Sequence, residues 1–247
     1  MSLPTKENKE RYVRDMFNSI AKRYDLLNTI MSLGMDTYWR KFTVKTSGVS
    51  TGGNALDICC GTGMLVYELS KVVGPHGKVT GLDFSEEMLL VAKKRVFELN
   101  LNNVELIQGN AMDLPFPENT FDCVTVGWGL RNVPDIAQVI AQMVKVVKPG
   151  GKIVSLDMAK PNAPVFKQVY WFYFEKLVPL FGKIWAGKES PYSYLHDSAK
   201  AFPHQNELAK MFANAGLKAT KAHDLFGGVV AAVEGTKEGV SNALSKS

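Results

Sequence analysis

The sequence predicts an α/β fold with a doubly wound parallel sheet. Between residues 54 and 157, short apolar runs typical of buried strands alternate with segments of helical periodicity. The first apolar run ends in the acidic and glycine-rich turn Asp57 to Gly63, after which a helical pattern opens at Met64. A second apolar run ends in Asp83. Because the ends of parallel strands meet at one edge of a sheet, we expect these two strand ends to form a ligand site.

The elements follow one another in a simple order. Residues from about 8 to 46 are expected to be helical, with an apolar stripe that includes Val13, Phe17 and Tyr24. A Gly/Ser/Thr-rich loop over 47–53 precedes the first strand, and Ser85 is a natural N-cap for a later helix. The core elements predicted by these patterns are strands at 54–59, 78–83, 104–108, 121–127 and 151–157, and helices at 64–73, 86–99 and 135–147.

The alternation stops after residue 157. The segment 163–187 is the most aromatic part of the chain, and a helix that is apolar on most sides must be buried by something. A further helix over 203–216 ends at Gly216, and two strands are expected at 217–224 and 228–235. We therefore divide a single domain into a helical cap (8–46), a cofactor-binding core (54–157), a helical lid insertion (163–216), a final strand pair (217–235) and a polar tail (236–247).

Composition excludes several classes of protein. The chain has 247 residues, 46% of them hydrophobic and 21% charged, which is typical of a globular domain. The net charge of +5 is dispersed and no nucleic-acid motif is present, so nucleic acid is not an expected partner. Cys59, Cys60 and Cys123 have neither disulfide nor metal-ligand spacing, and no metal site is expected. With no apolar run of membrane-spanning length and a polar start, a cytoplasmic location is expected, with weak attraction to an anionic membrane surface as a further expectation.

The glycine-rich turn indicates the ligand. A dinucleotide fingerprint needs a third glycine where this chain has Val66, and no phosphate-binding loop is present. Asp57 would repel a pyrophosphate, whereas a cationic ligand suits it. Asp83 can accept hydrogen bonds from both ribose hydroxyls. S-adenosylmethionine has a ribose, a cationic amino-acid end and no phosphate, so we expect it as the cofactor, with Asp57, Gly61, Thr62 and Gly63 on its methionine part and Asp83 on its ribose.

Four segments carry a family pattern. They are Met16 to Asn28 with Met31 to Gly34 and Trp39-Arg40; Asp57 to Gly63; Gly127 to Val133; and Tyr192, Tyr194, Leu195, Ser198 and Phe202-Pro203. On these residues the chain resembles the class I S-adenosylmethionine-dependent methyltransferases, and among them the ubiquinone/menaquinone biosynthesis C-methyltransferases. The resemblance implies a Rossmann-like sheet of seven strands, mostly parallel with the last antiparallel, under a cap made of N-terminal helices and a helical insertion.

The resemblance also implies a reaction and further site residues. The reaction is C-methylation of demethylmenaquinol to menaquinol; the alternatives are a methoxy-benzoquinol of ubiquinone biosynthesis, another lipophilic acceptor, or a non-catalytic cofactor-binding subunit. Asn110 and Ala111 would contact adenine, and Gly127 would offer backbone contact. Arg131, beside Asn132, is the candidate for stabilising a ring oxyanion, with a surface salt bridge as its alternative. Tyr24 is a second ring-positioning candidate, with a purely packed tyrosine as its alternative.

Other residues bear on the proton and on the acceptor. His196 and His204 are options for a proton shuttle, although partly exposed histidines without that role are common. At three positions the chain departs from the family pattern: Asp36 replaces a usual His, Asp157-Met158-Ala159 replaces Glu-x-Ser, and Val233 replaces a second His. A catalytic base at these positions is therefore in doubt. Val165 to Trp185 is expected to be a lid over a polyprenyl quinol, with a groove lined by Tyr170, Trp171, Phe174 and Phe181. Packing of this segment in a homodimer interface or in the domain core is the alternative.

Overall fold

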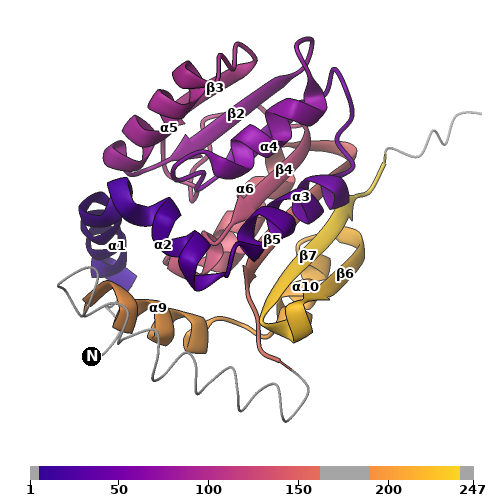
Figure 1. The fold of residues 1–247 in the computed structure, drawn as a ribbon. Coiled ribbons are helices and arrows are strands. Elements are labelled where there is room, and N and C mark those ends of the chain that lie inside the picture. The colour runs from indigo at the N-terminus through magenta and orange to yellow at the C-terminus, as the bar shows by residue number, and fades with distance from the viewer. Residues whose placement is uncertain (1–5, 162–189, 240–247) are drawn as a thin grey trace, which may run out of the picture.

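A computed structural model describes residues 6–161 and 190–239. Within these ranges, seven strands form one sheet in the order β3-β2-β1-β4-β5-β7-β6 (Figure 1). The strands are β1 (Asn54–Ile58), β2 (Lys78–Asp83), β3 (Val104–Gln108), β4 (Phe121–Gly127), β5 (Val147–Met158), β6 (Leu217–Leu225) and β7 (Val230–Lys237). The first five pair in parallel, and β7 runs antiparallel to both β5 and β6. The predicted fold class is confirmed.

Helices cover both faces of this sheet because each has one apolar stripe to bury. On one face, α3 (Met35–Ser47), α4 (Met64–Val73) and α5 (Glu86–Glu98) share a core cluster with β1 and β2. On the other face, α6 (Ile136–Val146) and α10 (Gln205–Asn214) pack with β4, β5, β6 and β7. The strand order reverses at β1, which lies between β2 and β4. A doubly wound sheet opens its ligand crevice at such a reversal, beyond the carboxyl ends of the strands.

The N-terminal helices lie at that edge of the sheet. They are α1 (Lys6–Ile20), the short 3-10 helix η1 (Ala21–Arg23) and α2 (Tyr24–Met31). Helix α1 contacts α5 and the 3-10 helix η2 (Leu130–Asn132), and α9 (Ser190–Ala201) also contacts η2. In Figure 1, α1, α2 and α9 accordingly lie together below the sheet. The crevice is thus bordered by helices that come from both ends of the chain.

The structure refines several predicted boundaries. The helical region predicted over 8–46 is divided by η1 and by a turn at Leu33 and Gly34, which both have positive φ. Strand β5 begins at Val147 rather than at residue 151, since the Pro149-Gly150-Gly151 segment forms an irregularity inside the strand instead of a turn before it. Helix α9 was not predicted as a separate element. The predicted lid, Val165 to Trp185, lies outside the described residues.

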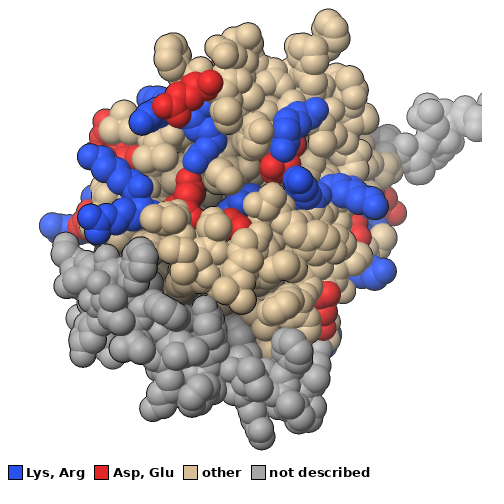
Figure 2. Space-filling model, viewed as in Figure 1, with Lys and Arg blue, Asp and Glu red and all other residues tan. Residues whose placement is uncertain are grey.

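Two predictions from composition can be compared with the structure. Lysine and arginine side chains are spread among aspartate and glutamate over the face seen in Figure 2, and do not gather into one basic block. In the ranges that the structure describes, no helix is both long enough and apolar enough to cross a membrane.

Candidate functional site

The chain turns sharply at the carboxyl ends of β1 and β4. Cys59 and Trp128 follow these strands with φ of 51° and 54°, a left-handed conformation that costs a non-glycine residue free energy of the order of 1–3 kcal/mol. The two turns touch, since a Cβ on Gly129 would lie 2.6 Å from the Cβ of Cys59. Only glycine fits at position 129, so the loops that leave β1 and β4 are held against one another.

Asp83, at the end of β2, fixes the loop after β1. Its two carboxylate oxygens accept hydrogen bonds from the backbone N–H groups of Gly61 and Ser85, each at 2.8 Å. The residue is only 5% exposed. Burial raises the pKa of Asp83 to about 6, although these backbone donors act in the opposite direction. Asp83 is thus a desolvated carboxylate that remains ionised near neutral pH.

Asp57, inside β1, is buried more completely. It is 1% exposed and accepts a hydrogen bond of 2.7 Å from the Thr125 hydroxyl on β4. Burial raises the pKa of Asp57 to about 8; the Thr125 hydrogen bond lowers it, while the charge of Asp83 raises it further. The loop after β1 therefore lies between two carboxyl groups whose ionisation is costly in the absence of a cation.

A cavity opens between these strand ends and α1. The residues predicted from the sequence that line it are Tyr24, Gly61, Asp83, Asn110, Ala111, Gly127 and Asn132. Asp57 and Thr62 line a smaller adjoining cavity that shares Tyr24, Gly61 and Gly127 with the first. Gly63 lines neither; it is the left-handed N-cap of α4, where a Cβ would press against Ala92 at 3.2 Å.

A third cavity lies on the other side of Tyr24 and Asn132. Both residues line it as well as the first cavity, so the two are neighbours. Arg131 and Tyr194 supply polar groups to the third cavity. The rest of its lining is mostly apolar and comes from Met16, Phe17, Ile20, Leu27, Met31 and Leu195. The arrangement places a largely apolar chamber that holds the Arg131 guanidinium beside the cavity at the strand ends, which holds the Asp83 carboxylate.

Arg131 forms a buried ion pair. Its Nη1 donates to Asp157 at 2.7 Å and to the carbonyl oxygen of Trp128 at 2.8 Å, and the two charged side chains are 5% and 2% exposed. Burial alone would lower the pKa of Arg131, but the Asp157 carboxylate raises it, with a smaller contribution from Tyr24. The alternative of a surface salt bridge is therefore wrong. The guanidinium stays cationic, and its Nε has no hydrogen-bond partner among the residues described.

Two tyrosines share the chamber with this cation. Burial raises the pKa of Tyr24, and the charge of Arg131 acts against that rise. The pKa of Tyr194 is raised to about 12 by burial, again with Arg131 opposing. Both phenols are therefore neutral hydrogen-bonding groups near pH 7, unsuited to act as bases.

Helix α1 is tied across the first cavity by polar contacts. The Lys9 ammonium donates to the carbonyl oxygens of Arg131 at 3.1 Å and Val133 at 2.8 Å. The Asn110 amide donates to Glu10 at 3.0 Å, and the Ser85 hydroxyl donates to an oxygen of the Asn18 side chain at 2.6 Å. These contacts reach the segments after β2, β3 and β4, so α1 closes the side of the cavity that the sheet leaves open.

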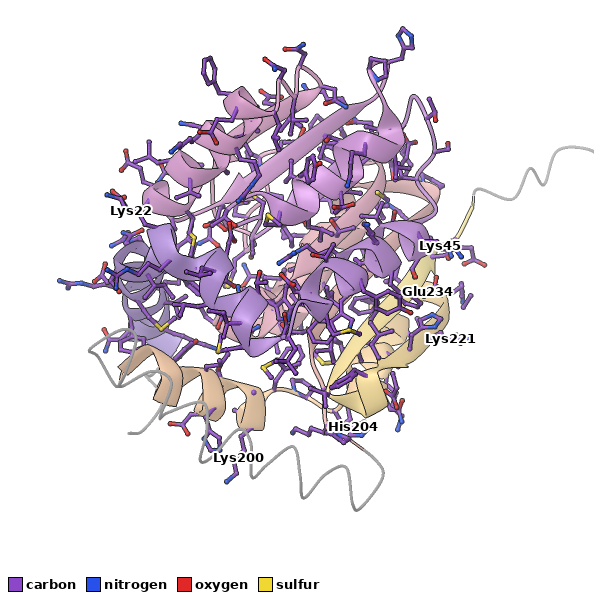
Figure 3. All side chains as sticks on the ribbon, viewed as in Figure 1. Lys22, Lys45, Lys200, His204, Lys221 and Glu234 are labelled. Carbon is purple, nitrogen blue, oxygen red and sulfur yellow. The ribbon has the colours of Figure 1, made fainter. Side chains whose placement is uncertain are left out.

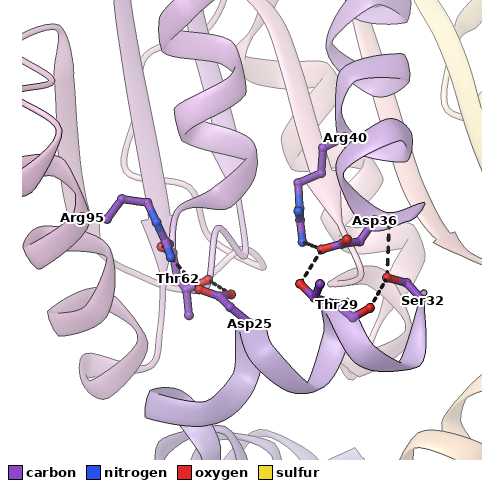
Figure 4. A network of polar contacts seen from close by, with 7 residues as sticks. All are labelled: Asp25, Thr29, Ser32, Asp36, Arg40, Thr62 and Arg95. Atoms are coloured by element: carbon purple, nitrogen blue, oxygen red, sulfur yellow. Dashed lines mark hydrogen bonds and ion pairs between the residues drawn. The ribbon is translucent and has the colours of Figure 1, made fainter. Parts of the chain in front are cut away.

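Helix α2 is tied to the loop after β1. The Asp25 carboxylate accepts from the Thr62 hydroxyl at 2.6 Å and from Arg95 Nη2 at 2.6 Å (Figure 4). Arg95 also donates to the carbonyl oxygen of Thr62. One carboxylate thus connects α2, the glycine-rich loop and α5.

Comparison with known proteins places this geometry in a family. The model of the ubiE/COQ5 methyltransferase family matches residues 5–237. The chain belongs to this family. A demethylmenaquinone methyltransferase from Desulfitobacterium hafniense is 56% identical over 94% of this chain and 92% of its own length. One from Shouchella clausii is 49% identical over 94% of this chain and 98% of its own length.

The fold is also found among solved structures. A SAM-dependent methyltransferase from Aquifex aeolicus superimposes with a TM-score of 0.60 at 22% identity, covering 79% of this chain and 88% of that protein. At this level of identity the likeness concerns the fold alone. The resemblance to ubiquinone/menaquinone biosynthesis methyltransferases inferred from the sequence motifs is confirmed by the family match.

The three departures from the family pattern have structural explanations in this methyltransferase. Asp157 retains a carboxylate and pairs with Arg131. Asp36 forms a buried ion pair with Arg40 at 2.7 Å. Val233 is 1% exposed and packs in the core. None of the three is therefore placed to act as a free base.

The two histidines named as proton shuttles lie elsewhere. The His196 ring contacts the Asp197 carboxylate at 2.9 Å on α9. His204 caps the start of α10, where its Nδ1 accepts from the Asn206 backbone N–H, at the outer edge of the fold (Figure 3). Neither residue is part of the lining of the three cavities.

Sequence reasoning missed four residues that frame the cavities: Glu10, Asp25, Arg40 and Asp157. Asp25 and Arg40 lie within family segments and Asp157 marked a departure from the pattern, so all three carried a signal that was given no role. Glu10 is an ordinary charged residue on an amphipathic helix, where a solvent-exposed role is the usual expectation.

Replacement of Asp57 by Asn tests the raised pKa. The pKa of Asp57 is about 8 in the unliganded fold and about 4 in the unfolded chain. The contribution of Asp57 to stability is therefore complete below about pH 4 and is lost as the pH rises towards 8. We expect the free energy of unfolding of the parent protein to fall over this interval, and to fall less in D57N. Urea unfolding at pH 5 and pH 8 measures both changes.

Asp122 provides a matched control. Partial burial raises its pKa, but Lys148 and the Asn54 N–H outweigh this and the pKa is lowered. The contribution of Asp122 to stability is therefore lost only under acidic conditions. Between pH 5 and pH 8, the free energy of unfolding of D122N should fall as much as that of the parent protein. An equal fall in D57N would contradict the role given to Asp57.

Proposed function

We propose that this protein transfers the methyl group of S-adenosylmethionine to a ring carbon of demethylmenaquinol, giving menaquinol. The observation that carries this proposal is the pair of neighbouring cavities, which Tyr24 and Asn132 both line. A cavity at the strand ends that holds the Asp83 carboxylate suits a cationic methyl donor, and a largely apolar chamber with one guanidinium suits a reduced quinone. The names of the relatives at 56% and 49% identity support the naphthoquinol as acceptor.

The donor site is assigned to residues at the strand ends. Asp57, Gly61 and Thr62 hold the methionine part, with Thr62 lining the same small cavity as Asp57. Asp83 binds the ribose hydroxyls through lone pairs left over from its two backbone hydrogen bonds. Asn110 and Ala111 contact adenine, and Gly127 offers its backbone.

The charges of the cavity support a cationic donor. Two desolvated carboxyl groups with raised pKa values stand beside the loop, and a positive ligand compensates for their ionisation. When bound, S-adenosylmethionine supplies a sulfonium methyl group that is open to in-line displacement. The same carboxylates would repel the pyrophosphate of a dinucleotide.

Arg131 is assigned to the acceptor. A hydroquinone carbon becomes nucleophilic once a ring hydroxyl loses its proton, because the charge spreads to the neighbouring carbon. The Arg131 guanidinium, held cationic by Asp157, stabilises that oxyanion in a chamber of low polarity. Tyr24 and Asn132, which line both cavities, orient the ring toward the donor. The ring regains aromaticity when the methylated carbon loses its proton.

Contact with a membrane surface is part of this proposal. Leu26, Ile30 and Leu33 are 57%, 39% and 82% exposed on and just after α2, the helix that also lines the acceptor chamber. Lys22 and Arg23 precede them. Apolar side chains beside basic ones are typical of a segment that docks on an anionic bilayer, where a polyprenyl quinol resides.

Replacement of Asp83 tests the donor site. In D83A the ribose would lose two charge-assisted hydrogen bonds, and we expect the Kd for S-adenosylmethionine to rise at least roughly tenfold. Calorimetric titration of both proteins measures the change. Asp113 is an exposed carboxylate in the segment after β3, and D113A should bind S-adenosylmethionine like the parent protein. Unchanged affinity in D83A would remove Asp83 from the site.

A turnover assay with two acceptors tests the reaction. We expect methyl transfer to reduced demethylmenaquinone to exceed transfer to the corresponding methoxy-benzoquinol, and the oxidised quinone to be inert because it has no ring hydroxyl to ionise. Product formation is followed by mass spectrometry with isotopically labelled donor. Exclusive activity on the benzoquinol would overturn the choice of acceptor, and activity on neither quinol would overturn the quinol class.

The role of Arg131 is tested in a variant that leaves no buried charge unpaired. The double replacement Arg131→Gln and Asp157→Asn removes both members of the ion pair, since removing only one is expected to destabilise the fold by about 3–5 kcal/mol. We expect kcat on demethylmenaquinol to fall roughly 100- to 1000-fold, with the Kd for S-adenosylmethionine nearly unchanged. Parental kcat in this variant would contradict the assignment of the oxyanion to Arg131.

A further inference from the structure

Arg40 on α3 is a buried cation with an unused donor. The residue is 4% exposed, yet it lines the small cavity that adjoins the loop after β1. Its Nη2 donates to Asp36 at 2.7 Å, whereas its Nη1 has no hydrogen-bond partner in the part of the chain that is described. A buried donor without a partner is costly, and more so when it carries charge. An anion that enters the cavity would supply the missing partner.

The side chain of Arg40 is held in place from two sides. Asp36, 2% exposed, is positioned one turn earlier on the same helix, and its carboxylate also lies 3.5 Å from the Thr29 hydroxyl (Figure 4). The Ser32 hydroxyl accepts from the Asp36 backbone N–H at 3.3 Å. On the other side, the guanidinium carbon stands 5.5 Å from the centre of the Trp128 ring, within the range of a cation–π contact. The guanidinium is therefore preorganised before any ligand binds.

The same cavity contains a carboxyl group that ionises when a cation is bound beside it. Its lining includes Asp57 as well as Arg40, together with Gly61, Thr62 and Gly127. A ligand group that carries both an ammonium and a carboxylate on one carbon matches such a pair, because each of its charges meets the opposite one. A group with only one charge would leave either Asp57 or Arg40 without compensation.

We propose that Arg40 binds the α-carboxylate of the methyl donor while Asp57 faces its α-ammonium, so that the small cavity recognises the free amino-acid end of S-adenosylmethionine. The inference rests on the proposed function, because it takes the donor to occupy the strand-end cavities. It adds a binding residue from α3, outside the glycine-rich loop. It also gives Asp36 a role, as the residue that positions Arg40.

Two ligands separate this inference from the proposed function. S-adenosylmethionine carries the amino-acid end, and 5′-methylthioadenosine has the same nucleoside and sulfur without it. The test compares the Kd of each ligand for the parent and for the double variant Asp36→Asn and Arg40→Met, which leaves no buried carboxylate without a partner. Thermal unfolding confirms that the variant is folded. The exposed Lys41 on the same helix provides a control for the loss of a cation from α3, K41M.

We expect the Kd for S-adenosylmethionine to rise roughly 10- to 100-fold in the double variant, and that for methylthioadenosine to stay within about twofold. The single variant Arg40→Lys should recover part of the affinity, because it keeps the charge and loses the forked geometry. Equal losses for both ligands, or no loss for either, would overturn the role of Arg40. Failure of the parent protein to bind either ligand would overturn the proposed function itself.

Discussion

Asp57 and Asp83 lie at the ends of neighbouring strands with 1% and 5% exposure, where ionising a carboxyl group forfeits the hydration that water would provide. The surrounding structure responds to that cost. Thr125 donates to one carboxylate, and the backbone N–H groups of Gly61 and Ser85 donate to the other. The loop after β1 takes its shape from these hydrogen bonds, and so does the position of every cavity that the loop borders.

The sheet supplies only half of the site. The strand ends supply Asp57 and Asp83 to the cavities, while α1 and α2 supply Phe17 and Tyr24. Tyr24 is central because it is one of the residues that line all three cavities. Asp57 and Asp83 stand at the strand ends, and the Arg131 guanidinium lines the apolar chamber. Under the proposed function, donor and acceptor would lie on either side of Tyr24.

The part of this site that sequence could predict is the part encoded locally. Asp57, Gly61 and Asp83 follow apolar runs at strand ends, and the parallel arrangement then brings them together without further information. Arg40 could not be assigned in this way, because its role depends on where α3 packs against the sheet. Asp25 depends on Thr62 and Arg95, which are distant in sequence. Gly63 was expected to contact the ligand because of its motif, yet it serves as the N-cap of α4 and packs against Ala92.

The contacts of Lys9 have a consequence for how the chain is made. The carbonyl groups that receive its ammonium belong to residues 122 and 124 positions further along. As the polypeptide emerges from the ribosome, α1 can contact α5 early, but its contacts with η2 cannot form until the turn after β4 has been synthesised and folded. Part of the surface of α1 is exposed to solvent during that interval, so a helix that is translated before the sheet completes its docking only after β4 is in place.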